Sequence, residues 1–255
     1  MSDSLNNTPE ARQRIQTAFS PQLLKQTGER LIDLLTSHFE SVEASRGRVL
    51  NWEDPPANAE KAAAFLDGRG NDQDLVARFG ELVQTMLGRG LNLHDPRYIG
   101  HQVPAPVPIA GLFDAVGSVT NQVMAIYEMG PWASSIEQAL VDALGQQIGW
   151  PKDQFAGLIT HGGSLANLTA LTTARNVSLG DAWEAGVARK GPAPVMLVHA
   201  DAHYGVARSA GILGIGTNNI ISIGLDERRR MDANRLDETL TELRRDNVPI
   251  AAVCA

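Results

Sequence analysis

The chain has 255 residues, with 22 basic and 29 acidic side chains, a formal net charge of −7 and 43% hydrophobic residues. This length allows one large domain or two smaller ones with a sizeable core. The acidic balance, without a basic stripe to neutralise phosphates, argues against a nucleic-acid partner. No apolar run reaches the length of a membrane span, so we also expect no membrane partner.

The N-terminus and the cysteine content indicate the compartment. Residues 1–14 are polar and lack the apolar segment of a secretory signal, and we expect them to be weakly ordered. A single cysteine, Cys254, cannot form an internal disulfide and fits a reducing compartment. We therefore predict a cytoplasmic location.

Helices dominate the first third of the chain. A stripe of leucines predicts an amphipathic helix from Pro21, and a second one is expected over about 73–87. The proline- and glycine-containing stretch between them, 46–72, predicts a connector with a short helix inside it. Because no strand alternation occurs here, we place a boundary near residue 90. Residues 1–90 form an N-terminal helical segment, and residues 91–255 form the first part of a second domain.

Strands and helices alternate in the rest of the chain. Two helices are expected first, over 109–125 and 134–148, after an irregular proline-rich segment. The expected elements then follow in chain order as strand 156–160, helix 165–178, strand 195–199, helix 204–213, strand 220–223, helix 234–245 and a last strand, 250–255. Such alternation predicts an α/β domain with a mostly parallel sheet flanked by helices. No helix follows the last strand, so we expect the sheet to be incomplete and the natural polypeptide to continue past Ala255.

A glycine pair and a serine stand where the first of these strands turns into a helix. The turn reads His161-Gly162-Gly163-Ser164. A turn of this kind directs unpaired backbone N–H groups and the positive end of the helix dipole at one spot, which suits a phosphate. The alternative is an ordinary strand–helix turn in which Ser164 is the N-cap.

Other candidate groups carry weaker signals. His199 and His203 are four residues apart, but they fall on a strand end and the following turn, so a shared metal on one helix face is not expected. His203 follows the carboxyl end of a strand, where parallel sheets bind their ligands. The segment Gly162–Ala166 lacks the last glycine of the G-x-S-x-G nucleophile elbow, so the motif for an acyl-transfer nucleophile at Ser164 is incomplete. The only tight basic run, residues 228–230, is flanked by acidic residues and predicts a solvated turn.

Several segments together resemble the pyridoxal-phosphate-dependent amino-acid decarboxylases of the glutamate, cysteine-sulfinate and aromatic-amino-acid type. The resemblance covers about residues 75–255, and the segments come in the order of the family. They are His94–Tyr98 with Gln102, Thr120–Pro131, Ile148–Pro151, Thr160–Leu168 with Ala174 and Arg175, Asp201–Tyr204, Gly214–Thr217 and Asp226–Arg228.

The resemblance implies a fold, a cofactor and a reaction. The fold is the large domain of the aspartate-aminotransferase type, and the N-terminal helical segment packs across a homodimer with a shared active site. The reaction is the decarboxylation of an L-amino acid to its amine and carbon dioxide, with pyridoxal 5'-phosphate (PLP) as cofactor. Gly163 and Ser164 would hold the cofactor phosphate, and His203, the catalytic candidate, would stack on the pyridine ring. The substrate side chain would lie near Tyr98, His101 and Gln102.

Two departures from the family pattern concern the substrate segment. An aspartate, Asp95, is inserted before the proline of the segment that starts at His94. The family segment is also one residue shorter near residue 100, so His101 and Gln102 could exchange their roles.

A third departure concerns the lysine on which PLP chemistry depends. PLP enzymes bind the cofactor through a Schiff-base lysine, and in this family the lysine follows the strand that begins at residue 250. None of the four lysines stands in a matching motif: Lys25, Lys61, Lys152 and Lys190. We expect the family lysine beyond Ala255. The alternatives are another carbon–carbon lyase of the same fold, of the sphingosine-phosphate-lyase type, or a non-catalytic remnant.

Overall fold

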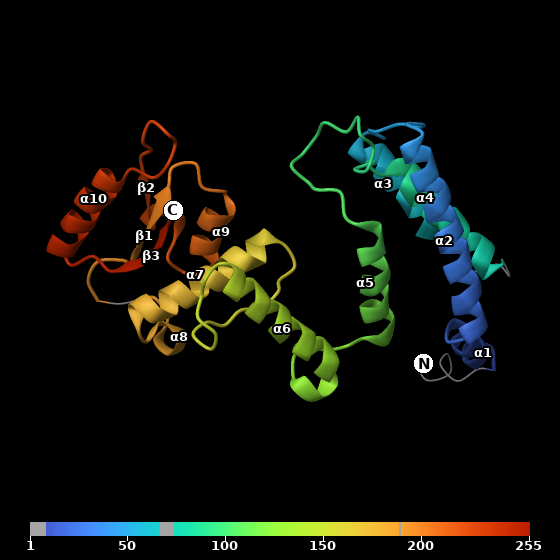
Figure 1. Cartoon of the computed structure of the whole chain (residues 1–255), viewed down its shortest axis with the longest axis horizontal. Helices are drawn as coiled ribbons and strands as arrows, with labels where there is room; N and C mark the ends of the chain where they lie inside the picture. Colours follow the sequence, from blue (N-terminus) through green and yellow to red (C-terminus); the bar gives the residue numbers. More distant parts are fainter. Residues whose placement is uncertain (1–8, 67–73, 189) are drawn as a thin grey trace, which may run out of the picture. The chain divides into compact units, whose positions relative to one another are not determined.

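The computed structural model describes residues 9–66, 74–188 and 190–255. The chain forms two compact units, Met1–Thr120 and Asn121–Ala255, and each is described by itself (Figure 1). The boundary expected near residue 90 lies inside the first unit. As a division of the domains it stays a prediction.

The described part of the first unit is built of helices. They are α1 (Pro9–Ala18), α2 (Pro21–Glu43), α3 (Pro55–Leu66), α4 (Leu75–Arg89) and α5 (Pro108–Thr120). The two amphipathic helices, α2 and α4, pack along one another (Figure 1). Side chains cap both of them, because Ser20 accepts a hydrogen bond from the backbone N–H of Leu23, and Asp74 accepts one from that of Val76.

Two helix predictions in this unit need correction. Residues 9–14 belong to α1 and are not frayed, because Pro9 suits the first turn of a helix and Glu10 complements its dipole. The helix expected over 109–125 ends at Thr120, where Asn121 takes a left-handed conformation with φ of 50°. Residues 1–8 and Gln73 lie outside the described part of the chain.

The second unit is an α/β unit around a short parallel sheet. Its elements are η1 (Tyr127–Met129), α6 (Pro131–Gln147), α7 (Gly163–Leu179), α8 (Ala182–Ala185), β1 (Val195–His199), α9 (Gly205–Ile212), η2 (Thr217–Asn219), β2 (Ile220–Ile223), α10 (Ala233–Arg245) and β3 (Ile250–Cys254). The strand order is β2-β1-β3, and both pairs are parallel. β1 therefore lies in the middle of the sheet.

Helices cover both faces of this sheet. Met196 and Val198 of β1 pack in one apolar cluster with Leu171 of α7 and Ala210 of α9. The residues between them on the strand, such as Leu197, face a second cluster that contains Leu236 and Leu240 of α10. Figure 1 shows α7 and α9 on one side of the strands and α10 on the other. Burial on both faces is why β1 is a continuous apolar run.

Residues 156–160 do not form a strand, so that prediction is wrong. The segment lies along α6: the Phe155 ring occupies the space beside the α carbon of Gly145, and Gly157 lies against Val141. The backbone N–H of Ile159 donates to the carboxylate of Glu137 (2.8 Å). Every second residue of the segment thus meets a successive turn of α6. The alternation expected of a strand is present, but no strand in the described part of the chain pairs with it.

No helix in the described part of the chain is both long and apolar enough to cross a membrane.

Candidate functional site

The N-terminus of α7 is open to a ligand. Gly162 precedes the helix with φ of 78°, a conformation that favours glycine, and no side chain caps the first turn. Ser164 lies inside the helix, so the reading of Ser164 as an N-cap is wrong. The first N–H groups of a helix have no partner within it. Here they lie at the positive end of the dipole of a 17-residue helix.

This turn fits the phosphate of a cofactor. A β carbon on Gly162 or Gly163 would meet no atom within 4 Å, so a ligand can approach the backbone closely. Ser164 is exposed on the first turn and adds a hydroxyl donor. Backbone N–H groups, a hydroxyl and a helix dipole are the groups that bind phosphate at helix N-termini. Gly163 and Ser164 are therefore placed as a phosphate site requires.

The loop between β1 and α9 fixes the ring of His203. The Nδ1 atom of His203 accepts a hydrogen bond from the backbone N–H of Gly205 (3.0 Å). A backbone N–H only donates, so the neutral imidazole carries its proton on Nε2. The Tyr204 ring lies beside it, with 4.1 Å between the ring centroids and 37° between the planes. His203 is exposed and has a defined orientation.

Gly205 joins the His203 loop to α7. It is buried, and a β carbon there would lie 2.8 Å from Nδ1 of His203 and 3.7 Å from the side-chain nitrogen of Asn167. Asn167 is on α7, one turn beyond Ser164. The structure therefore brings the predicted residues Gly163, Ser164 and His203 to one region of the second unit. Sequence reasoning missed Gly205 and Asn167, because nothing in the pattern links two residues so far apart in the chain.

We expect Gly205→Ala to displace the His203 ring. The added methyl would overlap Nδ1, so the ring or its loop has to shift. Displacement of a catalytic group by about 1 Å can lower a rate by about 100-fold. Gly211→Ala, on the same helix α9, is the matched control, because its β carbon would meet only the Thr217 side chain, at 4.0 Å. The ¹⁵N chemical shifts of His203 measure the displacement of the ring, and the rate of the reaction proposed below measures its effect in the full-length protein. Equal behaviour of the two variants would contradict it.

Asp95 and Arg97 fix the start of the predicted substrate segment in the first unit. The buried Asp95 carboxylate accepts hydrogen bonds from Nε (2.9 Å), Nη2 (2.7 Å) and the backbone N–H (2.9 Å) of Arg97. The backbone N–H of Tyr98 donates to the Asp95 carbonyl (2.8 Å). The aspartate that departs from the family pattern is thus the centre of the turn before Tyr98.

The hydrogen bonds from Arg97 lower the pKa of Asp95 to about 2. An ordinary aspartate titrates near pH ~4, so this carboxylate stabilises the fold above pH ~4 and loses that contribution as the pH falls towards its folded pKa. We expect the difference in unfolding free energy between the wild type and Asp95→Asn to shrink between pH ~4 and ~2. Denaturant unfolding across this range measures it. Asp54→Asn, at an exposed position of the same unit, is the control; a difference independent of pH would contradict the assignment.

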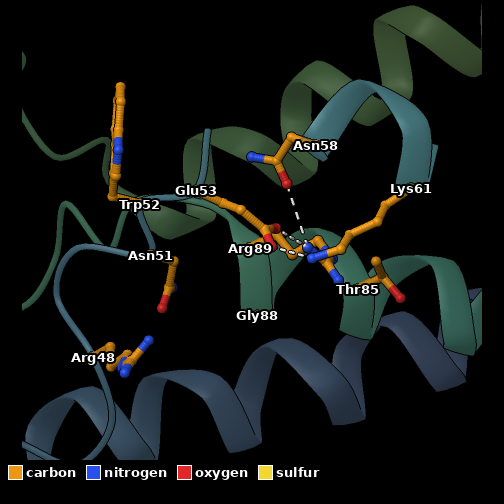
Figure 2. Close-up of a pocket in the computed structure, with 9 residues that line it drawn as sticks. All are labelled: Arg48, Asn51, Trp52, Glu53, Asn58, Lys61, Thr85, Gly88 and Arg89. Atoms are coloured by element: carbon orange, nitrogen blue, oxygen red, sulfur yellow. Dashed lines mark hydrogen bonds and ion pairs between the residues drawn. The ribbon is translucent and has the colours of Figure 1, made fainter. Parts of the chain in front are cut away.

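Tyr98 and His101 line a cavity of about 760 Å³ in the first unit. Trp52, Glu53 and Arg89 line it too, and they also line a neighbouring cavity of about 490 Å³ (Figure 2). Gln102 is exposed and does not line either cavity.

An ion-pair cluster lies in the smaller cavity. Figure 2 shows the Glu53 carboxylate paired with both Lys61 of α3 and Arg89 of α4. Arg89 also donates to the Asn58 side chain (3.3 Å). These contacts lower the pKa of Glu53, chiefly through the hydrogen bond from Lys61. The cluster ties α3 and the preceding segment to the end of α4.

The four lysines are paired or exposed, and the possible metal ligands of the described residues do not cluster. Lys25 pairs with Glu29 (3.8 Å), Lys61 pairs with Glu53, and Lys152 and Lys190 are exposed. Within the described residues, no three His, Cys, Asp or Glu side chains gather as a metal would require.

A helix N-terminus open to an anion, in a unit built on a parallel sheet with a histidine after its central strand, is an arrangement in which α/β proteins hold phosphorylated cofactors. Residues 83–255 match the model of the pyridoxal-dependent decarboxylase conserved domain. The chain belongs to this family, as predicted, and the family's cofactor is pyridoxal phosphate.

Known relatives agree with this assignment. The chain is 26% identical over 201 residues to L-2,4-diaminobutyrate decarboxylase of Acinetobacter baumannii, covering 74% of this chain and 38% of the relative. It is 29% identical over 210 residues to the acidic amino acid decarboxylase GADL1 of Homo sapiens, covering 82% and 39%. The chain thus spans less than half the length of these relatives.

A solved structure confirms the predicted fold class. The Oryza sativa TDC crystallised with PLP and tryptamine superposes with a TM-score of 0.77 at 19% identity, covering 93% of this chain and 49% of that one. At this identity the likeness concerns the fold alone. The described sheet and its helices are therefore part of the PLP-dependent decarboxylase fold.

Proposed function

We propose that the full-length protein decarboxylates an L-amino acid to the corresponding amine and carbon dioxide with pyridoxal 5'-phosphate as cofactor. One observation carries the proposal: in a chain of this family, the uncapped glycine turn of α7 and the ordered ring of His203 lie in one region. The relatives named above, which carry the names of decarboxylases for a basic and an acidic substrate, support the reaction type.

The chain's own residues would bind and orient the cofactor. The N–H groups of Gly163 and Ser164 and the Ser164 hydroxyl would hold the phosphate at the N-terminus of α7. His203 would lie against the pyridine ring, and its Nδ1 bond to Gly205 keeps the imidazole from rotating. When bound, PLP supplies the electron sink that accepts the electrons of the broken carbon–carbon bond.

The residues proposed near the substrate side chain are Tyr98, His101 and Gln102. Tyr98 and His101 line the larger cavity, and Gln102 follows directly. Asp95 and Arg97 would hold the backbone that presents Tyr98. Exact orientation matters because PLP permits several reactions and the protein selects the bond that breaks.

We further propose a homodimer with a shared active site, located in the cytoplasm. Helix α5 supports the dimer, because its apolar side chains, such as Phe113 and Val116, are largely exposed in the described chain. The single cysteine supports a reducing compartment.

The experiment is the measurement of carbon dioxide and amine from a panel of L-amino acids by the full-length protein, with and without added PLP. We expect equal amounts of both products from at least one amino acid and none without the cofactor. Cleavage of a phosphorylated long-chain base without carbon dioxide release would favour the lyase alternative, and no product at all would contradict catalysis.

A further inference from the structure

We propose that Arg229 is a positioning residue that holds the loop carrying His203. Three residues make up what we call the Arg229 clasp: Arg229 in the turn after β2, and His199 and Asp201 at the end of β1. Strands β1 and β2 are adjacent and parallel, so the segments that follow them leave the sheet at the same edge. The clasp joins them two residues before His203.

Arg229 contacts the β1–α9 loop in two ways. Its guanidinium pairs with the Asp201 carboxylate, and its backbone carbonyl accepts a hydrogen bond from Nε2 of His199 (3.1 Å). His199 in turn accepts at Nδ1 from the backbone N–H of Asp201 (3.0 Å). Both nitrogens of His199 are therefore used, and Asp201 is held through its side chain and its backbone.

The turn presents Arg229 in an unusual conformation. Its φ is 60°, in the left-handed region that favours glycine and that is unfavourable for other residues. Asp226 fixes this turn, because its carboxylate accepts the backbone N–H of Arg228 (2.9 Å) and of Arg230 (2.8 Å). An arginine at a position that favours glycine is consistent with a function for its side chain.

The exposure of the Arg229 and Asp201 side chains sets the size of the effect expected when their ion pair is lost. The Arg229 and Asp201 side chains are 76% and 48% exposed, so their ion pair adds little to global stability. An exposed pair can still set the population of one loop conformation within a factor of about five. Loss of the Arg229–Asp201 ion pair should therefore change the order of the loop that carries His203 and leave the thermal stability of the protein unchanged.

The test is the rate at which diethyl pyrocarbonate modifies His199 and His203 in the full-length protein, mapped by mass spectrometry against His38 as internal reference. Arg229→Gly keeps the left-handed turn and the carbonyl but removes the guanidinium. We expect both rates to rise about two- to fivefold, with the melting temperature unchanged. Arg229→Lys should restore most of the protection, and Asp201→Asn should match Arg229→Gly without adding to it in the double variant.

Arg228→Ala is the matched control, because it removes the same charge from the same turn at a side chain that takes no part in the clasp. Equal histidine rates in Arg228→Ala and Arg229→Gly would overturn the proposal. Its relevance for catalysis rests on the proposed function, where Arg229→Gly should lower kcat by a similar factor with KM unchanged. The histidine rates decide the clasp even if the protein releases no carbon dioxide from any amino acid.

Discussion

Replacing His203 with alanine in the full-length protein is expected to lower kcat about 100-fold while weakening PLP binding less than about fivefold. The reason lies in the geometry of the loop. The ring is oriented by the Gly205 N–H and lies beside Tyr204, so it can define the plane of a bound ring rather than anchor the cofactor. Cofactor affinity should instead depend mainly on the phosphate at α7.

His203→Phe separates the two possible contributions of this side chain. Phenylalanine keeps an aromatic face but loses both nitrogens and the bond to Gly205. If the face is what matters, this variant should recover part of the rate lost in His203→Ala. Steady-state kinetics and a PLP titration of each variant supply the comparison, and equal losses in kcat and in PLP affinity would refute the stacking role.

Replacing Ser164 with alanine should have the opposite pattern, with PLP affinity falling about five- to 150-fold. One donor to a phosphate dianion is lost, and a hydrogen bond to a charged group contributes about 1–3 kcal/mol. Dissociation constants from PLP fluorescence or absorbance titrations measure the change. Because the helix N-terminus remains, binding should be weakened and not abolished.

The controls for Ser164 lie on the same residue and the same helix. Ser164→Thr retains the hydroxyl and should bind PLP nearly as the wild type does. Thr173→Ala removes a hydroxyl that donates to the carbonyl of Thr169 (3.1 Å), two turns further along α7, and should leave affinity unchanged. Wild-type affinity in Ser164→Ala would mean that the phosphate binds elsewhere.

The sheet and its helices could be predicted well from the sequence where one physical signal dominated. The strands at 195–199 and 220–223 match β1 and β2 to the residue, because each is an apolar run bounded by turn residues. The segment 156–160 carries the same signal, yet it is no strand. A strand needs a partner for its backbone groups, and local sequence does not show whether one is present.

The candidate site divides in the same way. The helix that opens at Gly163 and Ser164 was predictable although no strand precedes it, and the position of His203 follows from the strand–turn–helix pattern of β1 and α9; the structure places them together. Their roles toward PLP stay predictions. The contacts that orient them were not readable: the sequence predicts a solvated turn around Arg229, and only the fold shows that its side chain reaches Asp201.

Asp95 shows the converse case. The sequence marked it as a departure from the family pattern without a reason, and its buried carboxylate, which accepts hydrogen bonds from Arg97, supplies one. The burial of a polar side chain such as Asp95 depends on tertiary placement, which local periodicity does not determine.

The most direct measurement is an absorbance scan of the full-length protein with PLP, before and after borohydride, with peptide mapping of the label. We predict a yellow band that borohydride bleaches, with the label on a lysine other than Lys25, Lys61, Lys152 and Lys190. Absence of the band, or a label on one of these four lysines, would contradict the account of this chain as the phosphate-binding part of a PLP-dependent decarboxylase.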